Sequence, residues 1–125
     1  MYTVRVETDF AAAHFLSHYH GKCENLHGHN YRVRLFAQGG TLDEGGMLVD
    51  FGVLKNALKT VIEGLDHTNL NDNPFFLGDP SAERIAHFIF SNVENELKDK
   101  GVNSSLLNAV EVFETHTNMA RYQRD

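Results

Sequence analysis

Apolar residues in this sequence recur at every second position near the start, then at helical spacing, and then at every second position again. Alternation is typical of strands buried on one face, whereas recurrence every three or four residues is typical of amphipathic helices. The alternating segments are residues 2–14, 27–35, 106–115 and 118–123, and the helical segments are residues 51–65 and 79–97. The chain is therefore expected to contain two strands, then two helices, then two strands.

This order predicts an α+β fold, with a four-stranded antiparallel sheet and both helices on one face. Local signals support the helices: Asp50 can cap the first, and Pro80 suits the first turn of the second. Gly64 and Gly101 lie near the expected helix ends. Because the sequence has no linker, repeat or low-complexity stretch, residues 1–125 are expected to form a single domain.

Composition excludes several classes of function. A net charge of −6 disfavours a nucleic-acid-binding protein, because phosphate recognition needs a basic surface. No apolar run is long enough to cross a membrane, and the first residues lack the apolar block of a signal peptide. The single cysteine cannot form an internal disulfide, so no oxidising compartment is needed. A cytoplasmic protein is expected.

Eight of the 125 residues are histidines, and His27-Gly28-His29 is the most informative group. Residues two apart in a strand project from the same face, so both imidazoles would point toward one place. His14 would reach that place if the first two strands pair. Three imidazoles with one open position are the donor set of a catalytic zinc site. From spacing alone, however, an isolated H-x-H pattern is more often a pair of ordinary surface or partly buried histidines than a pair of metal ligands.

Six sequence blocks, spread over nearly the whole chain, match known patterns in a fixed order. The first two blocks fit F-x-A-A-H and C-x-x-x-H-G-H. The blocks are residues 10–14, 23–31, 46–51, 65–72, 80–83 and 112–115. Together they resemble the signature of the 6-pyruvoyl-tetrahydropterin synthase family. One block is a weak signal, whereas the ordered combination is very specific.

The resemblance implies the tunnelling fold, in which the sheets of three chains form a barrel and two trimers stack into a hexamer. Within the family, the short chain is most similar to the bacterial 6-carboxy-tetrahydropterin synthases of the queuosine pathway. This similarity implies a Zn²⁺-dependent lyase that converts 7,8-dihydroneopterin triphosphate to 6-carboxy-5,6,7,8-tetrahydropterin, acetaldehyde and triphosphate. The zinc ligands would be His14, His27 and His29. A homo-oligomer is also expected because barrels remove the exposed edges of such a sheet.

The resemblance assigns roles to five further residues. Cys23 would be the base that takes a proton from the substrate, although lone cysteines are more often small buried residues. Asp66 and His67 would be an acid–base pair, provided that the loop turns there, since adjacent residues of a strand point apart. Glu114, on the inward row of its strand, would anchor the pterin by accepting two N–H groups, and Thr115 would add a hydrogen bond. Without the resemblance, Asp66 and His67 would be interpreted as turn residues, and Glu114 as a carboxylate at a strand end that reaches water.

Three alternative functions stay open. A 6-pyruvoyl-tetrahydropterin synthase would use the same site with a different outcome for the substrate side chain. Glu24 leaves open a variant that yields 6-hydroxymethyl-pterin, because some relatives use a glutamate near this position. A non-catalytic pterin or purine-binding module would need Glu114 but not Cys23 or the Asp66–His67 pair, so their presence disfavours it.

Overall fold

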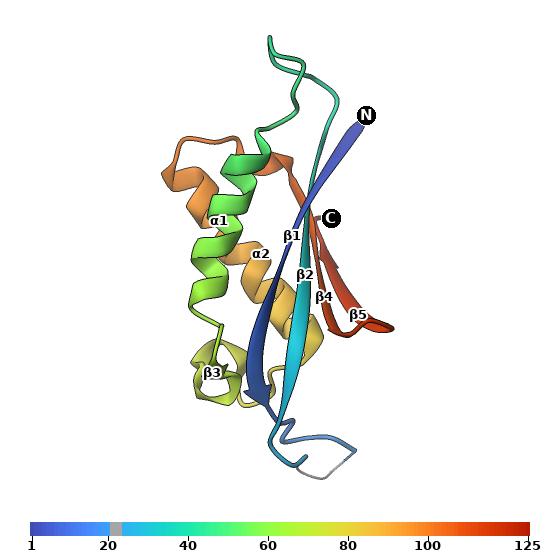
Figure 1. Ribbon diagram of the computed structural model, residues 1–125, viewed down its shortest axis with the longest axis vertical. Helices are drawn as coiled ribbons and strands as arrows, with labels where there is room; N and C mark the ends of the chain where they lie inside the picture. Colours follow the sequence, from blue (N-terminus) through green and yellow to red (C-terminus); the bar gives the residue numbers. More distant parts are fainter. Residues whose placement is uncertain (21–23) are drawn as a thin grey trace.

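The structure is a computed structural model that describes residues 1–20 and 24–125. A twisted sheet forms one layer, and two helices cover one of its faces (Figure 1). The strands are β1 (Tyr2–His14), β2 (His27–Gly39), β3 (Thr68–Asn69), β4 (Leu107–Thr115) and β5 (Asn118–Gln123). The helices are α1 (Phe51–Glu63) and α2 (Ala82–Asp99), with short 3-10 turns η1 (Leu70–Asp72), η2 (Pro74–Phe76) and η3 (Ser104–Leu106). The α+β class is confirmed, and the six predicted elements occur in the predicted order, with β3 added between the two helices. No helix among the described residues has the length and apolar character needed to span a membrane.

The sheet has the strand order β3-β1-β2-β4-β5. Strands β1 and β2 form a long antiparallel ladder that runs from Tyr2 opposite Gly39 to His14 opposite His27. The prediction of four strands was incomplete, because β3 adds a fifth strand, parallel to β1 at Ala12 and Ala13. Sequence alternation could not reveal β3, since its two residues lie inside a polar loop and show no period.

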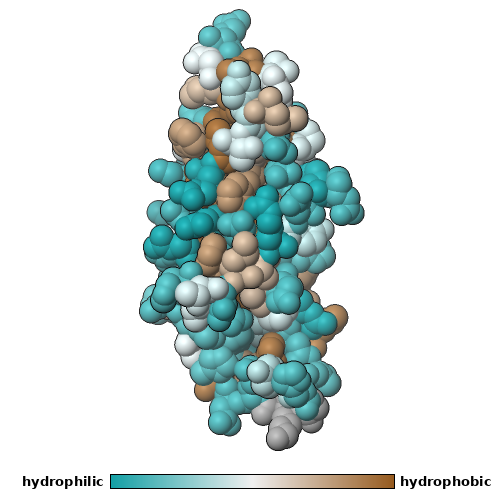
Figure 2. Space-filling view, turned by 90° about the vertical axis from the view of Figure 1, so that its right-hand side faces the viewer, coloured by the Kyte–Doolittle hydropathy of each residue, from teal (hydrophilic) through white to brown (hydrophobic). Residues whose placement is uncertain are grey.

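The two faces of the sheet differ in polarity. Side chains on the helix side form the core, with Tyr31, Val33 and Leu35 of β2 completely buried. On the opposite side, which we call the open face, the strands carry ion pairs such as Arg32–Asp9 (3.1 Å) and Arg121–Glu111 (2.9 Å). Figure 2, seen from the strand side, shows a largely hydrophilic surface across the middle of the molecule.

Capping side chains begin both helices. The Asp50 carboxylate accepts a hydrogen bond from the backbone N–H of Gly52, as its position in the sequence predicted. The second helix was predicted to begin at Asp79-Pro80, but α2 begins at Ala82. Ser81 is extended and caps the helix by accepting from Arg84 N, so the preceding residues form part of the loop.

The C-terminal Arg124 joins three segments that are distant in sequence. Its guanidinium donates to the carboxylate of Glu94 on α2 and to the carbonyl oxygens of Ser104 and Leu107. It also lies over the ring of Phe90, 5.1 Å from the centroid. These contacts fasten the end of the chain to α2.

Replacing Arg124 with alanine is therefore expected to lower the free energy of unfolding by about 1–2 kcal/mol, because charged hydrogen bonds at a partly exposed site are lost. Urea denaturation would measure the change. Lys98→Ala is the matched control. Lys98 forms a longer ion pair with the same Glu94, with Nζ 3.9 Å from Oε1, and its side chain is largely exposed. An equal effect of both changes would show that Arg124 contributes nothing beyond a surface charge.

Candidate metal centre

The β1–β2 ladder brings three histidines together at one end of the sheet. His14 and His27 are paired across the ladder, and His29 lies two residues further along the same face. The Nε2 atoms of His14 and His27 are 3.1 Å apart, and one ring nitrogen from each of the three residues lies within 4.8 Å of the others. The predicted convergence is confirmed, and these three residues form a group that could hold a metal ion.

Backbone carbonyls determine which nitrogen of two of these rings carries the proton. The Nδ1 atom of His14 is 2.9 Å from the carbonyl oxygen of Pro80, and Nδ1 of His27 is 2.8 Å from that of Asn25. A carbonyl oxygen only accepts, so both Nδ1 atoms are donors. In the neutral rings both Nε2 atoms then present lone pairs to each other across 3.1 Å. This arrangement is unfavourable without a cation and fits a metal ion, since tetrahedral zinc with Zn–N distances of about 2.0–2.1 Å separates its nitrogens by roughly 3.3 Å.

The third histidine also presents an unpaired nitrogen. Nε2 of His29 is buried and has no hydrogen-bond partner among the described residues. The nearest carboxylate oxygen, Oε2 of Glu114, is 3.7 Å away. Burial lowers the pKa of His29, although the charge of Glu114 opposes this shift. A neutral imidazole is the form that binds a metal ion, so the donor chemistry of all three residues fits such an ion.

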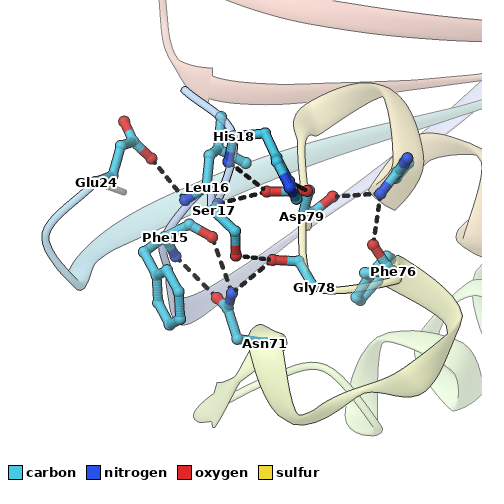
Figure 3. A network of polar contacts seen from close by, with 10 residues as sticks. Phe15, Leu16, Ser17, His18, Glu24, Asn71, Phe76, Gly78 and Asp79 are labelled. Atoms are coloured by element: carbon cyan, nitrogen blue, oxygen red, sulfur yellow. Dashed lines mark hydrogen bonds and ion pairs between the residues drawn. The ribbon is translucent and has the colours of Figure 1, made fainter. Parts of the chain in front are cut away.

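A polar network holds the segment that follows His14 (Figure 3). The Asn71 side chain pairs with both the N–H and the carbonyl of Phe15. The Asp79 carboxylate accepts from the N–H of Ser17 and contacts Nδ1 of His18 at 2.6 Å. The hydrogen bond from His18 lowers the pKa of Asp79. These contacts connect the end of β1 to the loop before α2, which also supplies the Pro80 carbonyl.

The Asp66–His67 pair lies in a turn, as its predicted function requires. His67 has a left-handed backbone conformation (φ 58°). Its Nδ1 is 3.0 Å from Oδ2 of Asp66, while Oδ1 of Asp66 accepts from the N–H of Ala11 at 2.9 Å. The Ala11 hydrogen bond, more than the contact with His67, lowers the pKa of Asp66. The ionised carboxylate therefore orients a ring that is 82% exposed.

The predicted site residues divide between the two faces of the sheet. Asp66, His67 and Thr115 line a cavity of about 640 Å³ on the open face, together with Arg32 and Arg34. Glu114 instead points to the helix side, where it approaches His29. Cys23, the predicted base, lies outside the described residues. Within one chain, the acid–base pair and the histidine cluster are thus separated by the β1–β2 ladder.

Tyr31 was not among the predicted site residues, yet its ring adjoins the histidine cluster. Its ring makes edge contacts with His14 and His29, at centroid distances of 5.9 and 5.4 Å. Burial raises the pKa of its hydroxyl, with further contributions from the charges of Glu114 and Glu24, so the hydroxyl keeps its proton. The one available signal was a tyrosine in an otherwise aliphatic row, two positions after His29.

Comparison with known proteins gives a consistent result. The family model described as 6-pyruvoyl tetrahydropterin synthase matches residues 3–125. A 6-carboxy-5,6,7,8-tetrahydropterin synthase of Synechocystis sp. is 42% identical, over 98% of this chain and 93% of its own. One from Bacillus subtilis is 39% identical, over 90% and 79%. The solved structure of Caenorhabditis elegans 6-pyruvoyl tetrahydropterin synthase superposes with a TM-score of 0.85 at 28% identity, covering 99% of this chain and 96% of that chain.

Proposed function

Because the chain belongs to the 6-pyruvoyl tetrahydropterin synthase family, we propose that it is a zinc-dependent lyase acting on 7,8-dihydroneopterin triphosphate. The products are 6-carboxy-5,6,7,8-tetrahydropterin, acetaldehyde and triphosphate, and the reaction serves queuosine biosynthesis in the cytoplasm. The coarser assignment, an enzyme of the tetrahydropterin synthase family, follows from the match over nearly the whole chain. The 6-carboxy product is favoured by the names of the two bacterial relatives.

One observation carries the metal-dependent part of the proposal. His14, His27 and His29 direct three nitrogens toward one place, and carbonyl contacts leave the Nε2 lone pairs of the first two facing each other. These three residues would hold the zinc. When bound, zinc would supply Lewis-acid polarisation of the hydroxylated side chain of the pterin.

The other residues of the site would bind the pterin and move protons. Glu114 would accept two N–H groups from the pyrimidine edge of the pterin, since one carboxylate can accept both. The side chains of Glu114 and Thr115 lie on different faces of the sheet. Thr115 would therefore donate its hydrogen bond to a pterin in the open-face cavity, not to the pterin that Glu114 of the same chain anchors. Nε2 of His67 would give and take protons, while Asp66 holds the ring by Nδ1. Cys23 remains the proposed base for the substrate side chain.

The division between two faces supports a site completed by more than one chain. The Asp66–His67 pair lies on the open face, whereas the histidine cluster lies on the helix side. Within the described residues, β1 is paired on its outer edge only at Ala12 and Ala13, and β5 is the last strand on the other side. Two such edges can pair between neighbouring chains. We therefore expect a homo-oligomer, a hexamer made of two trimers, in which one chain's acid–base pair serves another chain's metal centre.

Incubation of the zinc-loaded protein with 7,8-dihydroneopterin triphosphate is expected to yield 6-carboxy-5,6,7,8-tetrahydropterin and acetaldehyde. Mass spectrometry would identify the pterin, and a coupled assay would quantify acetaldehyde. The control is the same protein after zinc removal, which should form neither product. A 6-pyruvoyl product would assign the protein to the other branch of the family, and binding without turnover would favour the pterin-binding module.

The route to 6-hydroxymethyl-pterin, which would depend on Glu24, receives no support from the contacts of this residue. Oε1 of Glu24 accepts a hydrogen bond from the N–H of Leu16 at 3.0 Å, and Glu24 N donates to the carbonyl of Leu16 at 2.9 Å. Glu24 therefore closes the loop between β1 and β2. A carboxylate engaged in this way is less available as a base.

A further inference from the structure

The proposed chemistry leaves one buried polar group unused. The hydroxyl of Tyr31 has no hydrogen-bond partner among the described residues, although the residue is completely buried. Among the described residues, one other buried side-chain polar atom lacks a hydrogen-bond partner. It is Nε2 of His29, two positions earlier on the same face. An unsatisfied buried hydroxyl lowers stability, and phenylalanine would fill the same space without that cost.

The ring of Tyr31 is held against the histidine cluster. One face stacks on Phe10, with centroids 4.7 Å apart and the ring planes 11° from parallel. The rings of His14 and His29 contact it edge-on at 5.9 and 5.4 Å. Stacking on Phe10 and complete burial hold the side chain in one orientation, so its hydroxyl keeps a fixed position within the packed sheet. A donor in a fixed position and without a partner is suited to binding a ligand atom.

The two orphaned atoms together indicate the chemistry of that ligand atom. Nε2 of His29 offers a lone pair for a metal ion, whereas the protonated Tyr31 hydroxyl offers a hydrogen to an oxygen atom. A hydroxyl on the side chain of a pterin is such an oxygen, and an alkyl side chain would leave the phenol unsatisfied. Sites built to hydrogen-bond a substrate hydroxyl discriminate strongly against analogues that lack it.

From this geometry we infer that the Tyr31 hydroxyl donates a hydrogen bond to a side-chain hydroxyl of the bound pterin, and thereby selects hydroxylated pterins. The inference rests on the proposed function, because it takes a pterin beside the three histidines as the ligand. It adds a specificity-determining residue on β2, two positions after His29 on the same face of the strand.

The test is Tyr31→Phe, which removes only the hydroxyl. Isothermal titration of the zinc-loaded protein would compare 7,8-dihydroneopterin with 6-methyl-7,8-dihydropterin, which has no side-chain hydroxyl. The variant should bind 7,8-dihydroneopterin about 10- to 100-fold more weakly and the methyl compound equally well, as expected for loss of one hydrogen bond to a polarised oxygen. Its zinc content should be unchanged, and its zinc-free form should melt at the same or a higher temperature. Tyr122→Phe is the matched control, because Tyr122 stacks on His87 of α2, away from the cluster.

Several outcomes would overturn the inference. Equal weakening of both ligands would mean that Tyr31 acts through packing, and no weakening of either would mean that the hydroxyl touches no ligand. A lower melting temperature of the zinc-free variant with unchanged binding would assign the hydroxyl to a structural water. If the wild-type protein binds neither zinc nor 7,8-dihydroneopterin, the proposed function itself fails, and the role of Tyr31 fails with it.

Discussion

His27→Ala is expected to reduce the zinc content from one ion per chain to nearly none and to abolish turnover. His27 supplies one of three nitrogens, and its Nε2 lies 3.1 Å from that of His14, so its loss leaves two donors. Losing the stabilisation that a catalytic metal supplies, several kcal/mol, corresponds to at least about a thousandfold lower kcat. Metal analysis after gel filtration, together with the product assay, would measure both effects.

The same variant also tests whether the metal stabilises the fold. A metal ion that binds only the folded chain raises the melting temperature by an amount that grows with the free metal concentration relative to its Kd. Chelation should therefore lower the melting temperature of the wild-type protein and leave that of His27→Ala unchanged. His87→Ala, which changes an exposed histidine of α2, is the control and should keep both zinc and activity. Full zinc content in His27→Ala would contradict the assignment of this ligand.

His67→Ala is expected to lower kcat by about 10²–10⁴-fold while zinc content stays at the wild-type level, because a proton-transfer group is lost and the metal ligands remain. Asp66→Asn should have a smaller effect in the same direction, since it disturbs the ring that Asp66 orients at 3.0 Å. Combining the two changes should cost little more than His67→Ala alone, because residues that act as a unit are not additive. Steady-state kinetics of the three variants would measure this.

Mixing the two inactive variants would separate a shared site from one contained in a single chain. If the metal centre and the acid–base pair of each site come from different chains, random co-assembly of His27→Ala with His67→Ala restores about one quarter of the sites. Unfolding and refolding the variants together, followed by the product assay, would detect this recovery. Complete absence of activity in verified mixed oligomers would contradict the shared site.

Four of the strands, both helices and the convergence of three histidines could be predicted because their signals are local and periodic. A period of two placed His27 and His29 on one face, and the pairing of the first two strands brought His14 to them. Capping by Asp50 was likewise evident from its position before an amphipathic segment. Apart from the pairing of His14 with His27, the residues that determine these features lie within a few positions of one another.

What the sequence could not predict depends on contacts between distant segments. The Pro80 carbonyl that orients His14 lies 66 positions away. The side of the sheet on which His67 lies depends on a left-handed turn at a residue that is not glycine, which no local pattern indicates. The unsatisfied Tyr31 hydroxyl becomes evident only when the surrounding core is packed.

X-ray absorption at the zinc edge of the purified wild-type protein tests the central claim most directly. We expect one zinc ion per chain, with three imidazole nitrogens at about 2.0–2.1 Å and a light oxygen or nitrogen atom as the remaining ligand. A sulfur ligand near about 2.3 Å would instead bring Cys23 into the metal shell and contradict its role as a base. Absence of stoichiometric zinc after metal loading would contradict the assignment of His14, His27 and His29 as a zinc site.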